Sequence, residues 1–167
     1  KLFDKGRSAG GRMASRRVEV NGETFEFDHG AQHLIALGHV FQAVLDASNA
    51  KPWPDGNRRV GTPRMSAIPR ALAQGLDLTL SREVLEIAGE PGAWLLRHAA
   101  AAAAQRGAEP TSEDGPFDAV VVTAPAPQAA KLLRKPAPHL ARVLDQVTMA
   151  PCWTLMAAFR ERLPLPD

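Results

Sequence analysis

An apolar run in the second half of the chain sets the strongest limit on its fold. Residues 117–124 are nearly all apolar, and the run stops at Pro125 and Pro127. A continuous apolar strand is typical of sheets that are buried on both faces, as in α/β folds. Proline cannot donate to a strand ladder, so the strand is predicted to end there. The run therefore predicts an α/β fold with a buried strand over 117–124.

The opening of the chain predicts a strand that ends at an acid. Residues 1–4 end with Asp4, and a glycine-rich turn from Gly6 to Gly11 follows. Residues 18–20 and 24–27 then flank Asn21-Gly22. Asn-Gly between two alternating segments is the strongest short-range signal for a β-hairpin. We expect a strand, a glycine turn and a hairpin in that order.

The rest of the pattern mixes short helices and strands. Helices are predicted over 39–49, 66–74, about 127–133 and about 139–146. In the second of these, Ser66 is the expected N-cap, and Gly75 follows its end. Short strands are predicted over 76–80, 83–87, 93–97 and 152–159, with an irregular connection over 52–56. The alanine-rich stretch 99–114 is interpreted as a solvated insertion.

Composition narrows the class of protein. Hydrophobic residues make up 45% of the 167, enough for a buried core. The 20 basic and 18 acidic side chains nearly balance, so nucleic-acid binding is not required. A single cysteine, Cys152, excludes an intrachain disulfide, and no apolar run approaches the ~20 residues of a membrane span. We expect a cytoplasmic protein without membrane or nucleic-acid partners; the sequence carries no signal of oligomeric state.

Four segments carry residue types that suit a dinucleotide. After Asp4 come Gly10, Gly11 and Arg12; an acid at a strand end accepts hydrogen bonds from ribose hydroxyls, and bare glycines let N–H groups approach a pyrophosphate. The others are residues 28–33, 61–66 and 123–127. Residues 61–66 begin a helix, whose dipole favours an anion or an electron-rich ring edge. Taken singly, a solvent-exposed turn, a tight turn, helix capping or a strand exit explains each segment.

The order of these segments resembles a known family. The runs LFDKGRSAGGRM, FDHGAQH, TPRMSAIPRAL, SREVLEI and FDAVVVTAPAPQ are similar, in sequence order, to those of renalase-like flavoproteins of the amine-oxidase superfamily. The resemblance covers nearly the whole chain, and GGRM together with DHGAQ is its most specific part. It implies an FAD-dependent oxidoreductase with a Rossmann-like FAD-binding domain.

The resemblance also implies roles for individual residues. Asp4, with Lys5 beside it, matches the acid that holds the adenosine ribose, and Gly10, Gly11 and Arg12 match the phosphate and flavin turn. The remaining implied contacts are the ring-passing segment Gly30, Ala31, Gln32 and His33, then Met65 near the flavin, Val84 at the adenine, and Ala124 and Pro125. No catalytic acid or base is assigned, because in this class the flavin itself accepts the hydride.

The chain departs from the family pattern at both ends. It contains no G-x-G-x-x-G, the turn that receives the pyrophosphate, and it lacks the family's carboxyl-terminal segment. We therefore expect a piece truncated at both ends: residues 1–35 and 60–127 form an incomplete FAD-binding domain. Residues 36–59 are a helical and loop insertion, and 128–167 begin a mixed α+β substrate domain.

The remaining histidines, serines, cysteine and tryptophans do not predict a site of their own. His29, His33 and His39 lack the spacing of a metal site, and no serine has the context of a nucleophile. Cys152 is expected to be a small buried hydrophobe. Trp53 and Trp153 either pack in the core or line a substrate cavity.

The predicted reaction is hydride removal by FAD from a small molecule, either an amine or a reduced nicotinamide-like compound, with oxygen as acceptor. The alternatives are a non-catalytic remnant that no longer binds FAD, and a basic anion-binding protein that uses Arg7, Arg12, Arg16 and Arg17.

Overall fold

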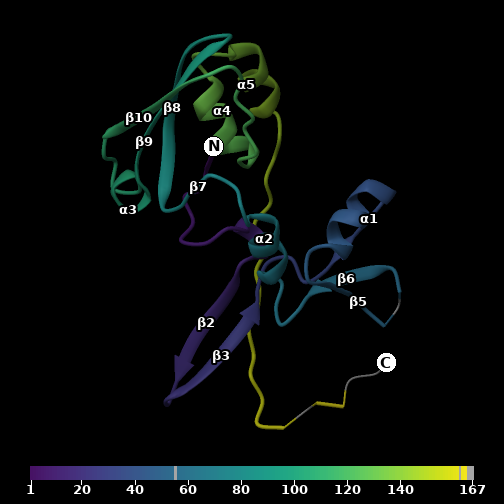
Figure 1. The fold of residues 1–167 in the computed structure, drawn as a ribbon. Coiled ribbons are helices and arrows are strands. Elements are labelled where there is room, and N and C mark those ends of the chain that lie inside the picture. Colours follow the sequence, from purple (N-terminus) through teal and green to yellow (C-terminus); the bar gives the residue numbers. More distant parts are fainter. Residues whose placement is uncertain (55, 162, 165–167) are drawn as a thin grey trace. The chain divides into compact units, whose positions relative to one another are not determined.

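The computed structural model describes residues 1–54, 56–161 and 163–164 and shows a mixed α/β architecture (Figure 1). The chain divides into two compact units. Unit 1 consists of residues 1–7 and 76–151, and unit 2 of residues 8–75 and 152–167. Each unit thus joins two separate stretches of sequence, and each is described here by itself. The predicted division into cofactor and substrate domains assigns functions to residues, and it stays a prediction.

Unit 1 is built around a three-stranded antiparallel sheet. Its order is β10 (Ser112–Phe117), β9 (Ala93–Ala100) and β8 (Arg82–Glu90). Only Pro91 and Gly92 separate β8 from β9, and Gly92 has a φ of 87°, which glycine adopts without strain. A parallel pair, β1 (Leu2–Phe3) with β7 (Leu78–Thr79), completes its strands. The predicted strands over 76–80, 83–87 and 93–97 are thereby confirmed.

Unit 1 has one short helix between β9 and β10 and two helices after β10. They are α3 (Ala101–Ala104), α4 (Ala126–Leu133) and α5 (Pro138–Leu144). Proline occupies the first or second position of α4 and α5, where its missing N–H is not needed. The helix α4 packs against both α5 and β8, and it buries Ala129 and Ala130. The two helices predicted in this region are confirmed within a few residues.

Unit 2 contains the predicted hairpin and a small second sheet. The hairpin pairs β2 (Ser15–Val20) with β3 (Glu23–Asp28), and Asn21 and Gly22 both have positive φ, as the Asn-Gly signal requires. The second sheet has the order β4 (Leu34–Ile35), β6 (Arg58–Gly61), β5 (Ala50–Pro52). The helices of unit 2 are the 3-10 turn η1 (Gly11–Met13), α1 (His39–Asp46) and α2 (Ala67–Leu72).

The core of unit 2 is a small cluster drawn from three parts of the sequence. Leu45, Met65 and Ile68 are at most 1% exposed and pack together. Partly buried hydrophobic residues surround them: Met13, Ala31, Leu34, Ala36, Ala50 and Val60. The core therefore ties the first turn of the unit to α1, α2 and both edges of the small sheet.

Three expectations about elements are wrong. Residues 99–114 are not a solvated insertion, because Ala99 and Ala101 are buried and Ser112–Asp114 pairs with β9. Residues 118–124 form no strand, and Val121 is 85% exposed. Nor do residues 152–159, where Trp153 is 95% exposed. The two predicted strands failed for one physical reason: an apolar segment becomes a strand only beside a neighbour that takes its hydrogen bonds, and among the described residues no ladder includes 118–124 or 152–159.

In the part of the chain that the structure describes, no helix is long and apolar enough to cross a membrane.

The irregular connection predicted over 52–56 overlaps β5 at Pro52, and Asp55 lies outside the described residues.

Candidate functional site

The glycine turn of unit 2 presents bare main chain next to an arginine. Gly10 and Gly11 have φ values of 125° and 48°, and Gly11 begins η1. A Cβ at Gly11 would meet no atom within 4 Å, so its main chain faces open space. Arg12 is exposed, and no hydrogen bond or ion pair joins its guanidinium to a described residue. The turn thus has the geometry for a phosphate: accessible backbone and a free planar cation.

The segment after the hairpin packs directly on this turn. A Cβ at Gly30 would collide with the Arg12 carbonyl group, and the Ala31 N–H donates to that same carbonyl oxygen at 2.9 Å. Glycine is therefore required at position 30 because two backbones touch there. Gln32 and His33 follow and are exposed. The structure brings these two predicted cofactor segments into contact.

One carboxylate links the hairpin to the start of α2. Asp28, the last residue of β3, accepts hydrogen bonds from the Ser15 hydroxyl at 2.5 Å and from the Met65 N–H at 3.1 Å. The hydroxyls of Ser15 and Ser66 are 3.1 Å apart. Ser66 was expected to cap α2 with its own side chain, and this is wrong: it makes no such hydrogen bond, and its backbone is already helical. Asp28, 37 residues earlier, accepts instead from the N–H of Met65, just before the N-cap position of α2.

Met65, which bonds to Asp28 through its N–H, is part of the core of unit 2. Its side chain is 1% exposed, and its sulfur lies 3.2 Å from the Gly61 nitrogen, which donates to it. A Cβ at Gly61 would collide with the backbone of Arg64 and Met65. Next to it, Arg64 and Arg17 both pair with Glu26 on β3. Met65, which is predicted to lie near the flavin, is therefore a core residue, and its backbone N–H bonds to Asp28.

A second group of predicted residues lies in unit 1. Asp4 follows β1, and its Oδ1 accepts the Gly6 N–H at 2.7 Å. Its backbone bonds to Thr79 and Arg82, which places it between β7 and β8. Lys5 is 4.0 Å from Glu83, next to Val84 on β8. Asp4, Lys5 and Val84 therefore share one edge of the unit, with the second carboxylate oxygen of Asp4 unbonded among the described residues.

Ala124 and Pro125 precede α4 in the same unit. The Pro125 carbonyl accepts the N–H groups of Gln128 and Ala129 at 2.9 and 3.0 Å. This places the two residues at the beginning of a helix. The predicted cofactor residues are thus divided between the two units.

A charged cluster that the sequence did not indicate lies at the edge of the unit 1 sheet. The buried His98 places Nε2 2.8 Å from Asp114, and Lys1 bonds to the other carboxylate oxygen at 2.6 Å. These hydrogen bonds, from Lys1 first and His98 second, lower the pKa of Asp114, and the bond to Asp114 raises the pKa of Lys1. On the neighbouring strand, Lys135 and then Arg97 lower the pKa of Glu86. No sequence motif joins these positions.

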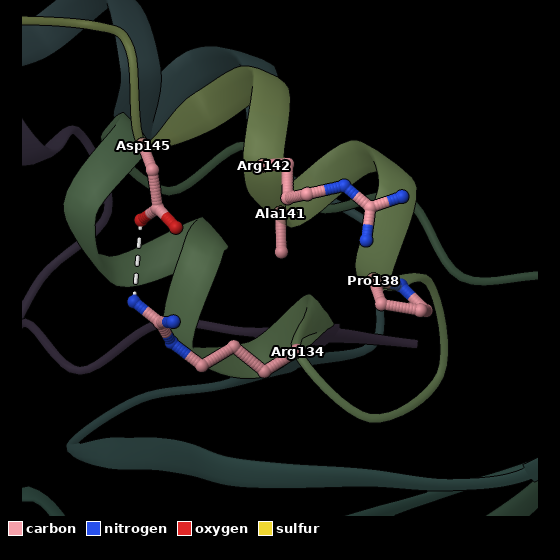
Figure 2. Close-up of a pocket in the computed structure, with 5 residues that line it drawn as sticks. All are labelled: Arg134, Pro138, Ala141, Arg142 and Asp145. Carbon is pink, nitrogen blue, oxygen red and sulfur yellow. Dashed lines mark hydrogen bonds and ion pairs between the residues drawn. The ribbon is translucent and has the colours of Figure 1, made fainter.

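Between α4 and α5 lies a pocket that the sequence also did not indicate (Figure 2). Arg134 crosses it to Asp145 at 3.2 Å, while the guanidinium of Arg142 extends to the Pro138 side. Its charged side chains are exposed. The pocket contains no buried polar group that would select a ligand.

The weaker candidates have different outcomes. Among the described residues no group of three His, Cys, Asp or Glu side chains is arranged to hold a metal ion. Cys152 is exposed, so the expectation of a buried hydrophobe is wrong. Trp153 at 95% exposure and Trp53 at 48% are not core residues either. A tryptophan is buried only where a neighbouring element covers it, and residues 152–159 form no such pairing.

A family model described as flavin containing amine oxidoreductase matches residues 54–167, well over half of the chain. The chain belongs to this family. The matched range includes Met65, Val84, Ala124 and Pro125. The remaining predicted cofactor residues precede the matched range: Asp4, Lys5, Gly10, Gly11, Arg12, Gly30, Ala31, Gln32 and His33.

Proposed function

We propose that this chain forms part of the FAD-binding, Rossmann-like domain of a renalase-like oxidoreductase. The proposed substrate is a small molecule, either an amine or a reduced nicotinamide-like compound, with oxygen as the final acceptor and the cytoplasm as the location. FAD supplies the hydride acceptor in such a protein. The chain's own residues bind and orient that cofactor.

The observation that carries the proposal is the contact between the two glycine segments of unit 2. The Gly30 backbone lies against the Arg12 carbonyl, while the neighbouring Gly11 main chain is open and the Arg12 guanidinium is free of protein partners in the described chain. A pyrophosphate needs accessible N–H groups and a planar cation at one place. A turn with a purely structural role would not need the Arg12 guanidinium to stay unpaired.

A buried polar atom supports the same segment as a cofactor contact. The Nδ1 of His29 is buried and has no hydrogen-bond partner among the described residues. Buried polar atoms are nearly always satisfied, so this atom is open to a hydrogen bond with another group, as are the unpartnered Arg59 Nε and His98 Nδ1. His29 directly precedes Gly30, so this orphaned atom lies next to the segment proposed to pass the flavin ring.

The Asp4 turn, which belongs to unit 1, supports the proposal by itself. One oxygen of Asp4 is fixed by the Gly6 N–H, which orients the carboxylate and leaves the other oxygen to accept a ribose hydroxyl. We propose that Asp4 holds the ribose and Val84 the adenine, with Lys5 beside them. Ala124 and Pro125 are proposed as further contacts at the start of α4.

The test is flavin binding by the purified chain. A visible absorbance scan is made on the chain as given and on a version preceded by a strand and a G-x-G-x-x-G turn, and each is then titrated with FAD. We expect flavin binding in at least the extended version. Arg12→Gln should weaken it roughly tenfold to a hundredfold, because a charge-assisted hydrogen bond to phosphate is lost.

Arg16→Gln is the matched control, since Arg16 is also exposed, lies four residues away and removes the same charge. Equal weakening by both variants would mean that only net charge matters. Flavin binding in neither version would overturn the proposal and favour the non-catalytic remnant. Salt-sensitive binding to oligonucleotides would favour the anion-binding alternative.

A further inference from the structure

Three predicted cofactor segments of unit 2 meet at a single side chain that none of the earlier motifs assigned. The glycine turn leads through Ala14 into Ser15, the hairpin ends at Asp28 just before Gly30, and Met65 opens the way into α2. Asp28 hydrogen-bonds to Ser15 with one oxygen and to the Met65 N–H with the other. Its two acceptor oxygens are thus divided between two segments that are 50 residues apart in sequence.

The network continues through the serines. Ser66 is 3% exposed, its hydroxyl lies 3.1 Å from that of Ser15, and its N–H also points to Ser15 at 3.4 Å. Buried hydroxyls and N–H groups that lose a partner destabilise a protein because they no longer bond to water. The four residues therefore form one connected set of hydrogen bonds.

We infer that Asp28 is a positioning residue for FAD, fixing the glycine turn, the Gly30 segment and the Met65 backbone in one arrangement. This inference rests on the proposed function. Asp28 does not itself contact the cofactor in this account; it acts through Ser15 and Met65. The effect follows from geometry: Gly30 touches the Arg12 carbonyl, and a shift of the hairpin end moves that contact. Small displacements of binding groups reduce affinity without unfolding the protein.

The experiment compares four variants of the full chain, extended where FAD binding requires it. Asp28→Ala removes both acceptors, and Ser15→Ala removes the bonds of Ser15 to Asp28 and Ser66 while leaving the Asp28–Met65 bond. Asp28→Asn keeps the size of the side chain, and its amide can accept from Met65 and donate to Ser15. Phe25→Ala removes a half-buried side chain from the same strand without touching the network.

The first readout is amide hydrogen exchange without flavin. We expect Asp28→Ala to speed exchange at Met65 and Ala31, with Ser15→Ala intermediate and Asp28→Asn near the wild type. The second is FAD titration with visible circular dichroism of the bound flavin. We expect Asp28→Ala to bind roughly tenfold more weakly and, at saturation, to give an altered flavin spectrum.

The outcomes separate the two proposals. If the wild type binds no FAD, the proposed function fails, and the positioning role fails with it. If the wild type binds FAD and Asp28→Ala leaves both exchange and the flavin spectrum unchanged, the inference alone is overturned. It is also overturned if Phe25→Ala, at an equal loss of melting temperature, changes affinity and spectrum as much. Restoration by Asp28→Asn supports the hydrogen bonds, and not the charge, as the cause.

Discussion

The two units of this chain are held together in different ways. In unit 1, the strands β8, β9 and β10 come from the continuous stretch 82–117 and bond mainly to their sequence neighbours. In unit 2, the hairpin, the small sheet and α2 make few ladder bonds to one another, and side chains join them: Asp28 to Met65, Glu26 to Arg64, and the core of Leu45, Met65 and Ile68. Backbone pairing organises the first unit, and side-chain bonding organises the second.

The difference teaches where a single substitution is felt. A backbone ladder tolerates changes of side chain, because its hydrogen bonds do not depend on them. In a unit whose segments are joined by side-chain hydrogen bonds, the loss of one such bond affects every segment that it connects. The predicted phosphate and flavin segments of unit 2 therefore depend on residues that do not contact a cofactor.

The largest effect is expected from truncating the small core of unit 2. Ile68→Ala removes a side chain that is 1% exposed, which lowers the free energy of unfolding by about 2–5 kcal/mol. Ile87→Ala is the counterpart in unit 1, at 4% exposure on β8. Chemical denaturation gives the magnitudes, and hydrogen exchange gives their location.

The location decides whether the comparison holds. We expect Ile68→Ala to speed exchange around Ala31 and Leu45 as well as in α2, since these share one core. Ile87→Ala should act on β8 and on the elements that contact it, β9 and α4. Exchange confined to α2 in the Ile68 variant would show that unit 2 is no more connected than unit 1.

A smaller effect is expected where backbones touch. In Gly30→Ala the added methyl group would meet the Arg12 carbonyl, and relieving that overlap is expected to destabilise the chain by about 1–3 kcal/mol. Gly22→Ala is the matched control: Gly22 has a φ of 82° but nothing within 4 Å of an added Cβ. Its loss comes from backbone conformation alone, about 1–2 kcal/mol.

Thermal melting checks the order, and exchange at Ala31 checks the cause. Faster exchange of the Ala31 N–H in the Gly30 variant, and not in the Gly22 variant, is the expected result. If both variants leave Ala31 protected, the contact between the two glycine segments does not exist in solution.

Local sequence signals predicted the elements that depend on local bonds. Asn21-Gly22 gave the hairpin because a positive φ at both positions is a property of those two residues. The strands of the unit 1 sheet and the helices begun by proline follow the same logic. The strands predicted over 117–124 and 152–159 were wrong because an apolar pattern indicates only that a segment favours burial. It does not show whether a neighbouring strand is present to pair with that segment.

The candidate site was predictable only in part. Gly10, Gly11 and Gly30 stood out because glycine has few uses other than turns and close approach, and the Gly30 contact shows the second use. The link from Asp28 to Met65 was not predictable, because an acid at a strand end looks the same whether its partner is near or 37 residues away. The same holds for His98 and Asp114, because the register of β9 and β10 pairs His98 with Ser112, two residues before Asp114.

The smallest expected effect is a dependence of stability on acid that belongs to unit 1. Asp114 has a pKa lowered from its ordinary value of 3.8 by hydrogen bonds from Lys1 and His98. A lowered pKa means that the folded chain binds the proton more weakly than the unfolded chain. The stabilisation is therefore fully present above the ordinary value and is lost as the pH falls below it toward the folded pKa.

Asp114→Asn should remove this contribution. We expect the variant to be less stable than the wild type near neutral pH, and the difference to shrink as the pH falls below 3.8, because protonation of Asp114 removes the same charge that the amide lacks. Melting temperatures measured across that range test it, with exchange at β9 and β10 showing where the change occurs. Because Asp114 is partly exposed, the effect is smaller than those of the core and glycine variants. A difference between variant and wild type that stays constant with pH would mean that the carboxylate's charge contributes nothing, and that unit 1 is held by its ladder alone.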